Sequence, residues 1–188
     1  MCMRSCRRRT TKRSEKYCGN TAAAEKVLKA RAIHGIMSAM ENQEKTICRI
    51  GERASLTKTF TEEDIAAFAK LSLDDNGMHT DPALARRGLF RRPVVHGVLV
   101  ASLISSVMGT KLPGHGTVLQ DQKIEYVNPV YPGDTITAEV TLTGAEESER
   151  YYIAELTGIC RSQDDVVCAK AVCHQLMLKR FFTVEGLE

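Results

Sequence analysis

The segment HGVLVASLISSVMG, residues 96–109, most constrains the fold, because its side chains are apolar on nearly every face of a helix. Small Ser and Ala residues are the main exceptions to its large apolar side chains. A helix that is hydrophobic all round must be buried on most of its sides. The segment is interrupted by polar residues before it reaches the roughly 18 apolar residues that span a bilayer. We therefore expect a soluble protein in which this helix is enclosed by the rest of the chain.

The residues that follow the helix are expected to form the sheet that encloses it. Their apolar and polar side chains alternate with the two-residue period of a β-strand. TITAEVTL, residues 135–142, places apolar side chains on one face and Thr or Glu on the other. Further strands are expected over Thr117–Asn128, Tyr151–Arg161 and Val166–Leu178, separated by polar turns. One face of the last strand carries small side chains that would let a helix approach closely: Val167, Ala169, Ala171 and Cys173.

The residues before the apolar segment predict one extended stretch and one helix. Residues 47–60 are typical of an extended stretch, and Thr61 then caps a helix that ends near Leu71, with Asp64 at the capping-box distance. Helices segregated to one side of an antiparallel sheet define an α+β plan. A long apolar helix gripped by a curved antiparallel sheet is the hot-dog fold, which we predict for a single domain over residues 46–188.

Residues 1–45 form a basic tail with a possible helix over residues 22–40. The first sixteen residues carry a formal charge of +6, whereas the whole chain carries +3. The excess of basic residues in the chain therefore lies in the tail. The net charge of the chain gives no support to nucleic-acid binding by the domain. The tail suits a mitochondrial transit peptide, a start site assigned too early, or a disordered basic appendage. The expected location is cytoplasmic, or mitochondrial if the tail is a transit peptide.

The seven cysteines are an odd number and show no C-x-x-C pair or metal-ligand spacing. Scattered free thiols in a reducing compartment fit this pattern. Cys168 and Cys173 lie five residues apart in one expected strand, which predicts that they occupy opposite faces and do not share a metal.

The loop LDDNGMHTD, residues 73–81, gathers carboxylates, an amide and an imidazole directly after the first helix. Polar turns and helix caps explain part of it, and Asp81 before Pro82 is best explained as a cap. Asp74 and His79 also suit one shared water molecule, since a carboxylate and an imidazole can move protons to and from it. An imidazole titrates near physiological pH, as proton transfer in the cell requires.

The residues F-T-x-x-D-I-x-x-F-A-x-L-S-x-D-x-N-G-M-H-x-D, 60–81, followed by P-V-V-H-G, 93–97, resemble the MaoC-like, (R)-specific enoyl-CoA hydratase family. That family carries D-x-N-P-x-H-x-D and then P-x-x-H-G. The turns at residues 112–114 and 132–134 also match, and the resemblance covers about residues 47–177. One position departs from the family, because Gly77 stands where the family usually has Pro, which relaxes the backbone beside the catalytic pair.

The resemblance implies reversible hydration of trans-2-enoyl thioesters to (3R)-3-hydroxyacyl thioesters, without a metal or redox cofactor. It implies Asp74 as the carboxylate that orients water, His79 as acid and base, Asn76 as a positioning partner and the Gly97 amide as oxyanion donor. His96 and Ser102 are further candidates for the acyl pocket, although packing alone would also explain them. The resemblance also implies a homodimer whose substrate is an acyl-CoA or acyl-carrier-protein thioester.

Two rival functions fit the same fold. A thioesterase would hydrolyse the thioester, and a non-catalytic module would bind it without turnover. Nucleic-acid binding would depend on the basic tail alone, and it lacks the aromatic side chains that usually accompany such sites. The expected partners are therefore a thioester substrate and a second copy of the chain, and not nucleic acid or membrane.

Overall fold

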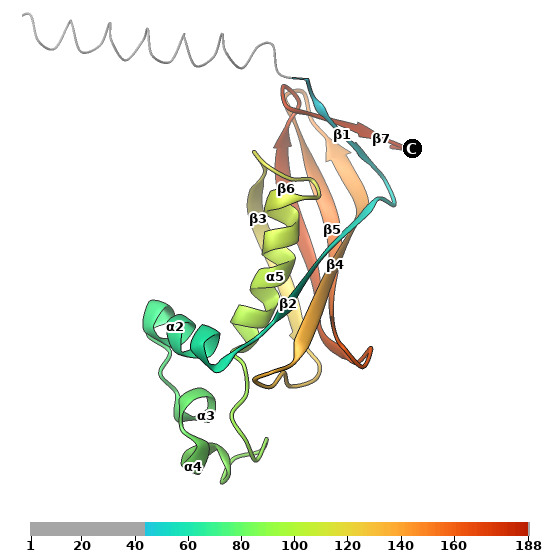
Figure 1. Ribbon diagram of the computed structural model, residues 1–188. Coiled ribbons are helices and arrows are strands. Elements are labelled where there is room, and N and C mark those ends of the chain that lie inside the picture. Colours follow the sequence, from blue (N-terminus) through green and yellow to red (C-terminus); the bar gives the residue numbers. More distant parts are fainter. Residues whose placement is uncertain (1–43, 188) are drawn as a thin grey trace, which may run out of the picture. The chain divides into compact units, whose positions relative to one another are not determined.

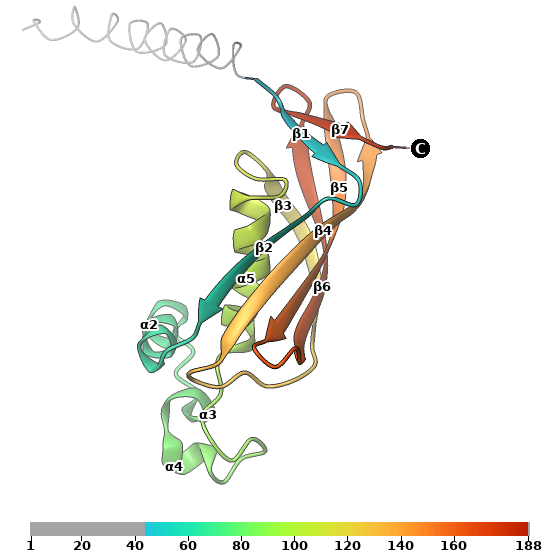
Figure 2. The same ribbon diagram turned by 45° about the vertical axis from the view of Figure 1, so that its right-hand side comes forward.

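A five-stranded antiparallel sheet, in the order β2-β4-β5-β6-β3, curves around helix α5 (Figures 1 and 2). This computed structural model describes residues 44–187. The strands of the sheet are β2 Arg53–Thr59, β3 Val118–Tyr126, β4 Thr135–Glu147, β5 Tyr151–Ser162 and β6 Val167–Leu178. The predicted α+β arrangement is confirmed. The predictions for the N-terminal tail and its helix concern residues outside the described part of the chain.

Helix α5, Gly97–Thr110, packs against the inner face of the sheet. Six of its side chains are buried, as the apolar sequence predicts: Val100, Ala101, Leu103, Ile104, Val107 and Met108. Gly158 of β5 lies directly beneath Ile104, and a Cβ atom added to Gly158 would lie 2.6 Å from Cγ2 of Ile104. The absence of a side chain at Gly158 therefore allows the helix and the sheet to approach closely.

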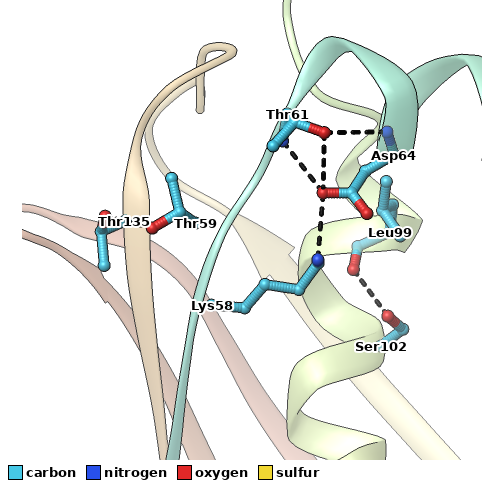
Figure 3. A network of polar contacts seen from close by, with 7 residues as sticks. All are labelled: Lys58, Thr59, Thr61, Asp64, Leu99, Ser102 and Thr135. Carbon is cyan, nitrogen blue, oxygen red and sulfur yellow. Dashed lines mark hydrogen bonds and ion pairs between the residues drawn. The ribbon is translucent and has the colours of Figure 1, made fainter.

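The first helix after β2 is α2, Glu62–Ser72, and its capping box is formed as predicted (Figure 3). The Thr61 hydroxyl accepts a hydrogen bond from the Asp64 amide, and the Asp64 carboxylate accepts one from the Thr61 amide. Lys58 forms an ion pair with the same carboxylate at 3.0 Å. Two short helices follow, α3 Gly77–Thr80 and α4 Pro82–Ala85, which the sequence did not predict.

A second, two-stranded parallel sheet joins β1, Thr46–Arg49, to β7, Phe182–Glu185. Gly51 makes the turn between β1 and β2 with a φ of +87°, a left-handed conformation that favours glycine. The sequence did not predict strand β7, because its four residues are too few to show a clear alternation of apolar and polar side chains. No helix within residues 44–187 is both long and apolar enough to cross a membrane.

The four cysteines in the described part of the chain are free and buried: Cys48, Cys160, Cys168 and Cys173. Burial raises the pKa of Cys160 to about 12 and that of Cys173 to about 11, so these thiols remain protonated. The prediction that Cys168 and Cys173 occupy opposite faces was wrong. A register shift where β6 pairs with β5 beside Cys160 interrupts the alternation, and both side chains are buried.

Candidate active site

The polar loop lies where α2, α3 and α4 gather at the N-terminal end of α5 (Figure 1). Helix α2 ends at Ser72, and the next residue, Leu73, turns the chain into the loop with a left-handed φ of +63°. The Val94 amide donates to the Met78 carbonyl at 3.2 Å, and the Val95 amide donates to the Val130 carbonyl at 2.8 Å. The loop and the start of α5 are therefore held against each other by backbone hydrogen bonds.

His79 lies half-buried in α3, and its ring orientation is fixed. Its Nδ1–H donates to the Val94 carbonyl at 2.7 Å, because a carbonyl can only accept. This bond selects the neutral tautomer whose Nε2 carries a lone pair and is able to accept a proton. The His79 amide donates to the Asn76 carbonyl at 2.9 Å, which fixes the backbone as well. His79 therefore has the geometry of a general base.

His96 lies behind His79 and is only 2% exposed. Its ring stacks on the His79 ring with centroids 3.8 Å apart and planes inclined by 24°, and the Phe68 ring meets it edge-on at 5.0 Å. Its Nε2–H donates to the Asp74 backbone carbonyl at 3.0 Å. Its buried Nδ1 has no hydrogen-bond partner among the described residues. His96 thus links the backbone of Asp74 to the ring of His79.

Asp74 carries an exposed carboxylate at the start of the loop. Its Oδ1 accepts a long hydrogen bond of 3.4 Å from the Asn76 amide, and the Asn76 side chain caps α3 by accepting from the Met78 amide. One side-chain oxygen or nitrogen from each of Asp74, His79 and His96 lies within 4.8 Å of the others. The structure therefore brings Asp74 and His79 together, and it places Asn76 in the turn between them.

The same three side chains are residue types that bind transition metals, but the stacked rings oppose a shared ion. The lone pair of an imidazole nitrogen lies in the plane of its ring. Two rings stacked at 3.8 Å and inclined by only 24° have nearly parallel planes, so their lone pairs do not converge on one point at bonding distance. Metal–nitrogen bonds of about 2.0–2.1 Å require such convergence. The arrangement suits a water molecule at Asp74 and His79 better.

A cavity of about 250 Å³, here called the Gly97 cavity, opens beside His79 and Gly97. Most of its walls are apolar, and they include Phe90, Val100 and Tyr126. A second cavity of about 260 Å³ reaches His79 from the side of α2. The imidazole therefore stands between an apolar cavity large enough for part of an acyl chain and a second open space.

Gly97 is the first residue of α5, so its amide N–H has no acceptor within the helix. The N-terminus of a helix also carries a partial positive charge that attracts anionic oxygens. A Cβ atom at Gly97 would lie 3.0 Å from the Tyr126 ring, so a larger residue would require the ring to move. Gly97 therefore allows the Tyr126 ring to approach the start of α5 closely, at the wall of the Gly97 cavity.

Both candidates for the acyl pocket, His96 and Ser102, lie outside the Gly97 cavity. Ser102 donates its hydroxyl to the Leu99 carbonyl at 2.7 Å within α5 (Figure 3). His96 is covered by His79 and Phe68. The walls of the cavity instead include Phe90 and Tyr126, which the sequence did not single out. In the expected strand, Tyr126 lies two residues after Ile124 and so shares its face. This alternation could have identified Tyr126 as a candidate.

Replacing Gly77 with Pro is expected to stabilise the protein by about 0.4–1 kcal/mol, because proline restricts the unfolded chain. Gly77 is the first residue of α3, a position that proline favours. Asn76 already has the extended backbone that precedes proline, with φ −53° and ψ 123°. The nearest obstacle is the flexible tip of Leu84, 3.1 Å from an added Cβ.

Thermal and urea unfolding of Gly77→Pro would measure the effect, with Gly77→Ala as the matched control. The alanine variant restricts the unfolded chain less and should gain less stability. A melting temperature lower for the proline variant than for the native chain would contradict the prediction.

Residues 46–157 match the model of the MaoC like domain. The chain belongs to the MaoC-like domain family. An (R)-specific enoyl-CoA hydratase from Aeromonas caviae is 45% identical over 108 residues, which are 57% of this chain and 79% of that protein. A mitochondrial 3-hydroxyacyl-[acyl-carrier-protein] dehydratase from Arabidopsis thaliana is 34% identical over 116 residues, 62% of this chain and 69% of that protein.

Solved structures of the family show the same fold. The (R)-hydratase from A. caviae involved in PHA biosynthesis superposes with a TM-score of 0.63 at 40% sequence identity. The superposition covers 69% of this chain and 96% of that one. The chain therefore shares the fold of this family, and the hot-dog fold predicted from the sequence is confirmed.

Proposed function

We propose that this MaoC-like chain is a hydro-lyase that interconverts trans-2-enoyl thioesters and (3R)-3-hydroxyacyl thioesters. The relatives named as (R)-specific enoyl-CoA hydratases support the reaction. The single observation that carries the mechanism is the hydrogen bond from Nδ1 of His79 to the Val94 carbonyl. It leaves Nε2 as the basic nitrogen of His79, a residue whose ring lies close to the Asp74 side chain and lines the Gly97 cavity.

In the proposed mechanism, Asp74 and His79 hold one water molecule next to the β-carbon of the enoyl group. As the water oxygen bonds to the β-carbon, Nε2 of His79 takes one of its protons, and Asp74 orients the water by accepting the other in a hydrogen bond. The α-carbon then receives a proton from the same acid–base pair, which restores the starting state. General acid–base catalysis of this kind contributes on the order of 10² to 10⁴ in rate.

The thioester oxygen gains negative charge as the water adds, and the Gly97 amide is the proposed donor to it. A backbone N–H at a helix N-terminus is fixed before the reaction and needs no reorganisation during it. The Gly97 cavity beside this amide has mostly apolar walls. Where an apolar wall keeps water away, the interaction with a developing charge is stronger.

The assay for this proposal follows the loss of ultraviolet absorbance when a conjugated enoyl thioester is hydrated, and a stereospecific dehydrogenase identifies the (3R) product. Hydration by the purified chain is the expected result. Release of free thiol from a saturated acyl thioester would instead indicate a thioesterase. Saturable binding of the thioester without turnover would indicate a non-catalytic module.

The proposed functional form is a homodimer joined through β3, because this strand forms an edge of the sheet. Strand β3 pairs with β6 on one side only, and it spans nine residues. Val118 is 58% exposed and Tyr126 is 51% exposed along it. A long edge with exposed apolar side chains is a template for pairing with another strand. Pairing β3 with its own copy across a two-fold axis would cover both residues.

Replacing Val118 with Lys is expected to weaken the dimer by about 100-fold or more, because each copy would place an unpaired ammonium group in the apolar contact at a cost of several kcal/mol. Sedimentation equilibrium at several concentrations would measure the dissociation constant. The matched control is Val166→Lys, which adds the same charge at a 45% exposed site in the turn between β5 and β6. Equal dissociation constants for the two variants would place the interface elsewhere.

A further inference from the structure

Four arginines lie in the seven residues RRGLFRR, 86–92, here called the arginine segment. All four side chains are exposed. The sequence contains no Asp or Glu between Asp81 and Asp121, so the segment is not neutralised locally. Within residues 44–187 no carboxylate lies within 4.0 Å of these guanidinium groups, although other arginines do form ion pairs. The arginine segment is therefore a concentrated positive charge without a described partner.

The arginine segment borders the proposed catalytic centre. Phe90, in its middle, lines the Gly97 cavity together with His79. Val94 follows the segment by two residues, lines the same cavity and accepts the hydrogen bond that orients His79. Arg91 directly follows Phe90, and Arg87 precedes it by three residues. An anionic group on a ligand that extends from the cavity toward the arginine segment would meet these arginines.

The backbone holds the arginine segment in a defined conformation. The Arg86 and Arg87 amides donate to the Pro82 and Leu84 carbonyls at 3.1 and 3.0 Å. Arg91 has a φ of +63°, a left-handed conformation that is uncommon for a non-glycine residue. The guanidinium of Arg92 lies 3.5 Å from the centroid of the Tyr131 ring. A stacked guanidinium keeps its N–H edge open for an anion.

We infer that the arginine segment binds the phosphates of a coenzyme A thioester, whose phosphorylated adenosine diphosphate lies beyond the pantetheine arm. This inference rests on the proposed hydratase function and names its carrier. Guanidinium groups bind phosphates through paired, charge-assisted hydrogen bonds. Two residues separate Arg91 from Val94, so their Cα atoms lie at most about 11 Å apart. When the length of the arginine side chain is added, the distance from Val94 to the Arg91 guanidinium group becomes similar to the length of a pantetheine arm.

The charges around the second cavity favour a small anion over an acyl carrier protein. Glu62 lines that cavity with His79, and Glu62, Glu63 and Asp64 form the first turn of α2. Asp74 and Asp75 are exposed on the adjacent loop. An acidic carrier protein would cover a broad surface and meet these carboxylates as like charges. A nucleotide is small enough to contact the arginine segment alone.

The inference is tested with the triple variant Arg86→Gln, Arg87→Gln and Arg91→Asn, since asparagine tolerates the left-handed backbone at residue 91. Calorimetry with coenzyme A itself should show binding weakened on the order of 10- to 100-fold. The value of kcat/KM should fall by a similar factor for an enoyl-CoA. It should stay unchanged for the enoyl thioester of pantetheine, which lacks the phosphates.

The charge-matched control combines Arg150→Gln, Lys170→Gln and Arg180→Gln. These side chains are exposed and line neither cavity beside His79, so coenzyme A binding should stay unchanged. Unaltered binding in the arginine variant would overturn the inference. An equal loss with the pantetheine thioester would also overturn it, because the segment would then only support the cavity. A loss confined to an acyl-carrier-protein thioester would assign the segment to that carrier. The calorimetric result does not depend on turnover, so failure of the hydratase proposal would be seen separately.

Discussion

Replacing His79 with Gln is expected to lower kcat for enoyl-thioester hydration on the order of 10³-fold, within the range for loss of a general acid–base group. Glutamine can still donate from its amide to the Val94 carbonyl, which now accepts from the His79 ring. The amide cannot take a proton from water near neutral pH, so the chemical step should slow while KM changes little. Steady-state kinetics with an enoyl-CoA would measure both constants.

Two comparisons sharpen this experiment. Asp74→Asn should also lower kcat strongly, and the double variant should lose much less than the product of the single losses, because both residues act on one water. His115→Gln makes the same chemical change at an exposed site that lines neither cavity beside His79, and it should retain the native kcat. Native kcat in His79→Gln would remove the imidazole from the mechanism.

Replacing Gly158 with Ala is expected to destabilise the fold by about 1–3 kcal/mol, because the added methyl group overpacks the core. The new Cβ would lie 2.6 Å from Cγ2 of Ile104, and that methyl group sits on a stiff β-branched side chain. Helix α5 or strand β5 would have to move to relieve the contact. The melting temperature should fall by about 2–4 °C for each kcal/mol.

Urea unfolding of a mutant cycle would test the packing argument. Ile104→Ala alone should cost about 2–5 kcal/mol through the cavity it leaves. Gly158→Ala should be less harmful in that background, because its methyl group enters the space that Ile104 vacated. Gly144→Ala is the matched control, since a Cβ at Gly144 meets nothing within 4 Å. A similar loss in Gly144→Ala and Gly158→Ala would trace the effect to strand backbone and not to contact with α5.

Much of the fold was predictable because its signals are local. The capping box of α2 depends on Thr61 and Asp64, three residues apart, and the apolar character of α5 depends on its own side chains. Strand alternation likewise predicted β3 to β6, though the strand bounds shifted by a few residues. The β-bulge beside Cys160 was not predictable, since it depends on how β5 and β6 pair. This bulge is the reason why the sequence assigned Cys168 to the wrong face of the sheet.

The candidate site was predicted as a set of residues but not as a geometry. The five-residue spacing of Asp74 and His79 is in the sequence, and the structure brings the two together. The tautomer of His79 depends on Val94, fifteen residues away, which the chain reaches only after α4. The stacking of His96 on His79 and the approach of Tyr126 to Gly97 likewise depend on tertiary packing. Residue spacing contains no information about such contacts.

The pairing of β1 with β7 has a practical consequence for engineering. Thr46 lies opposite Phe182, so the first and last described strands run side by side, at the end of the sheet away from α2, α3 and α4 (Figures 1 and 2). Labels, immobilisation tags or fused enzymes attached at residue 45 or 187 would begin far from the mouth of the Gly97 cavity. Because the two strands are parallel, residues 45 and 187 lie at opposite ends of the pair, so fusions made at the two positions would leave the domain in opposite directions.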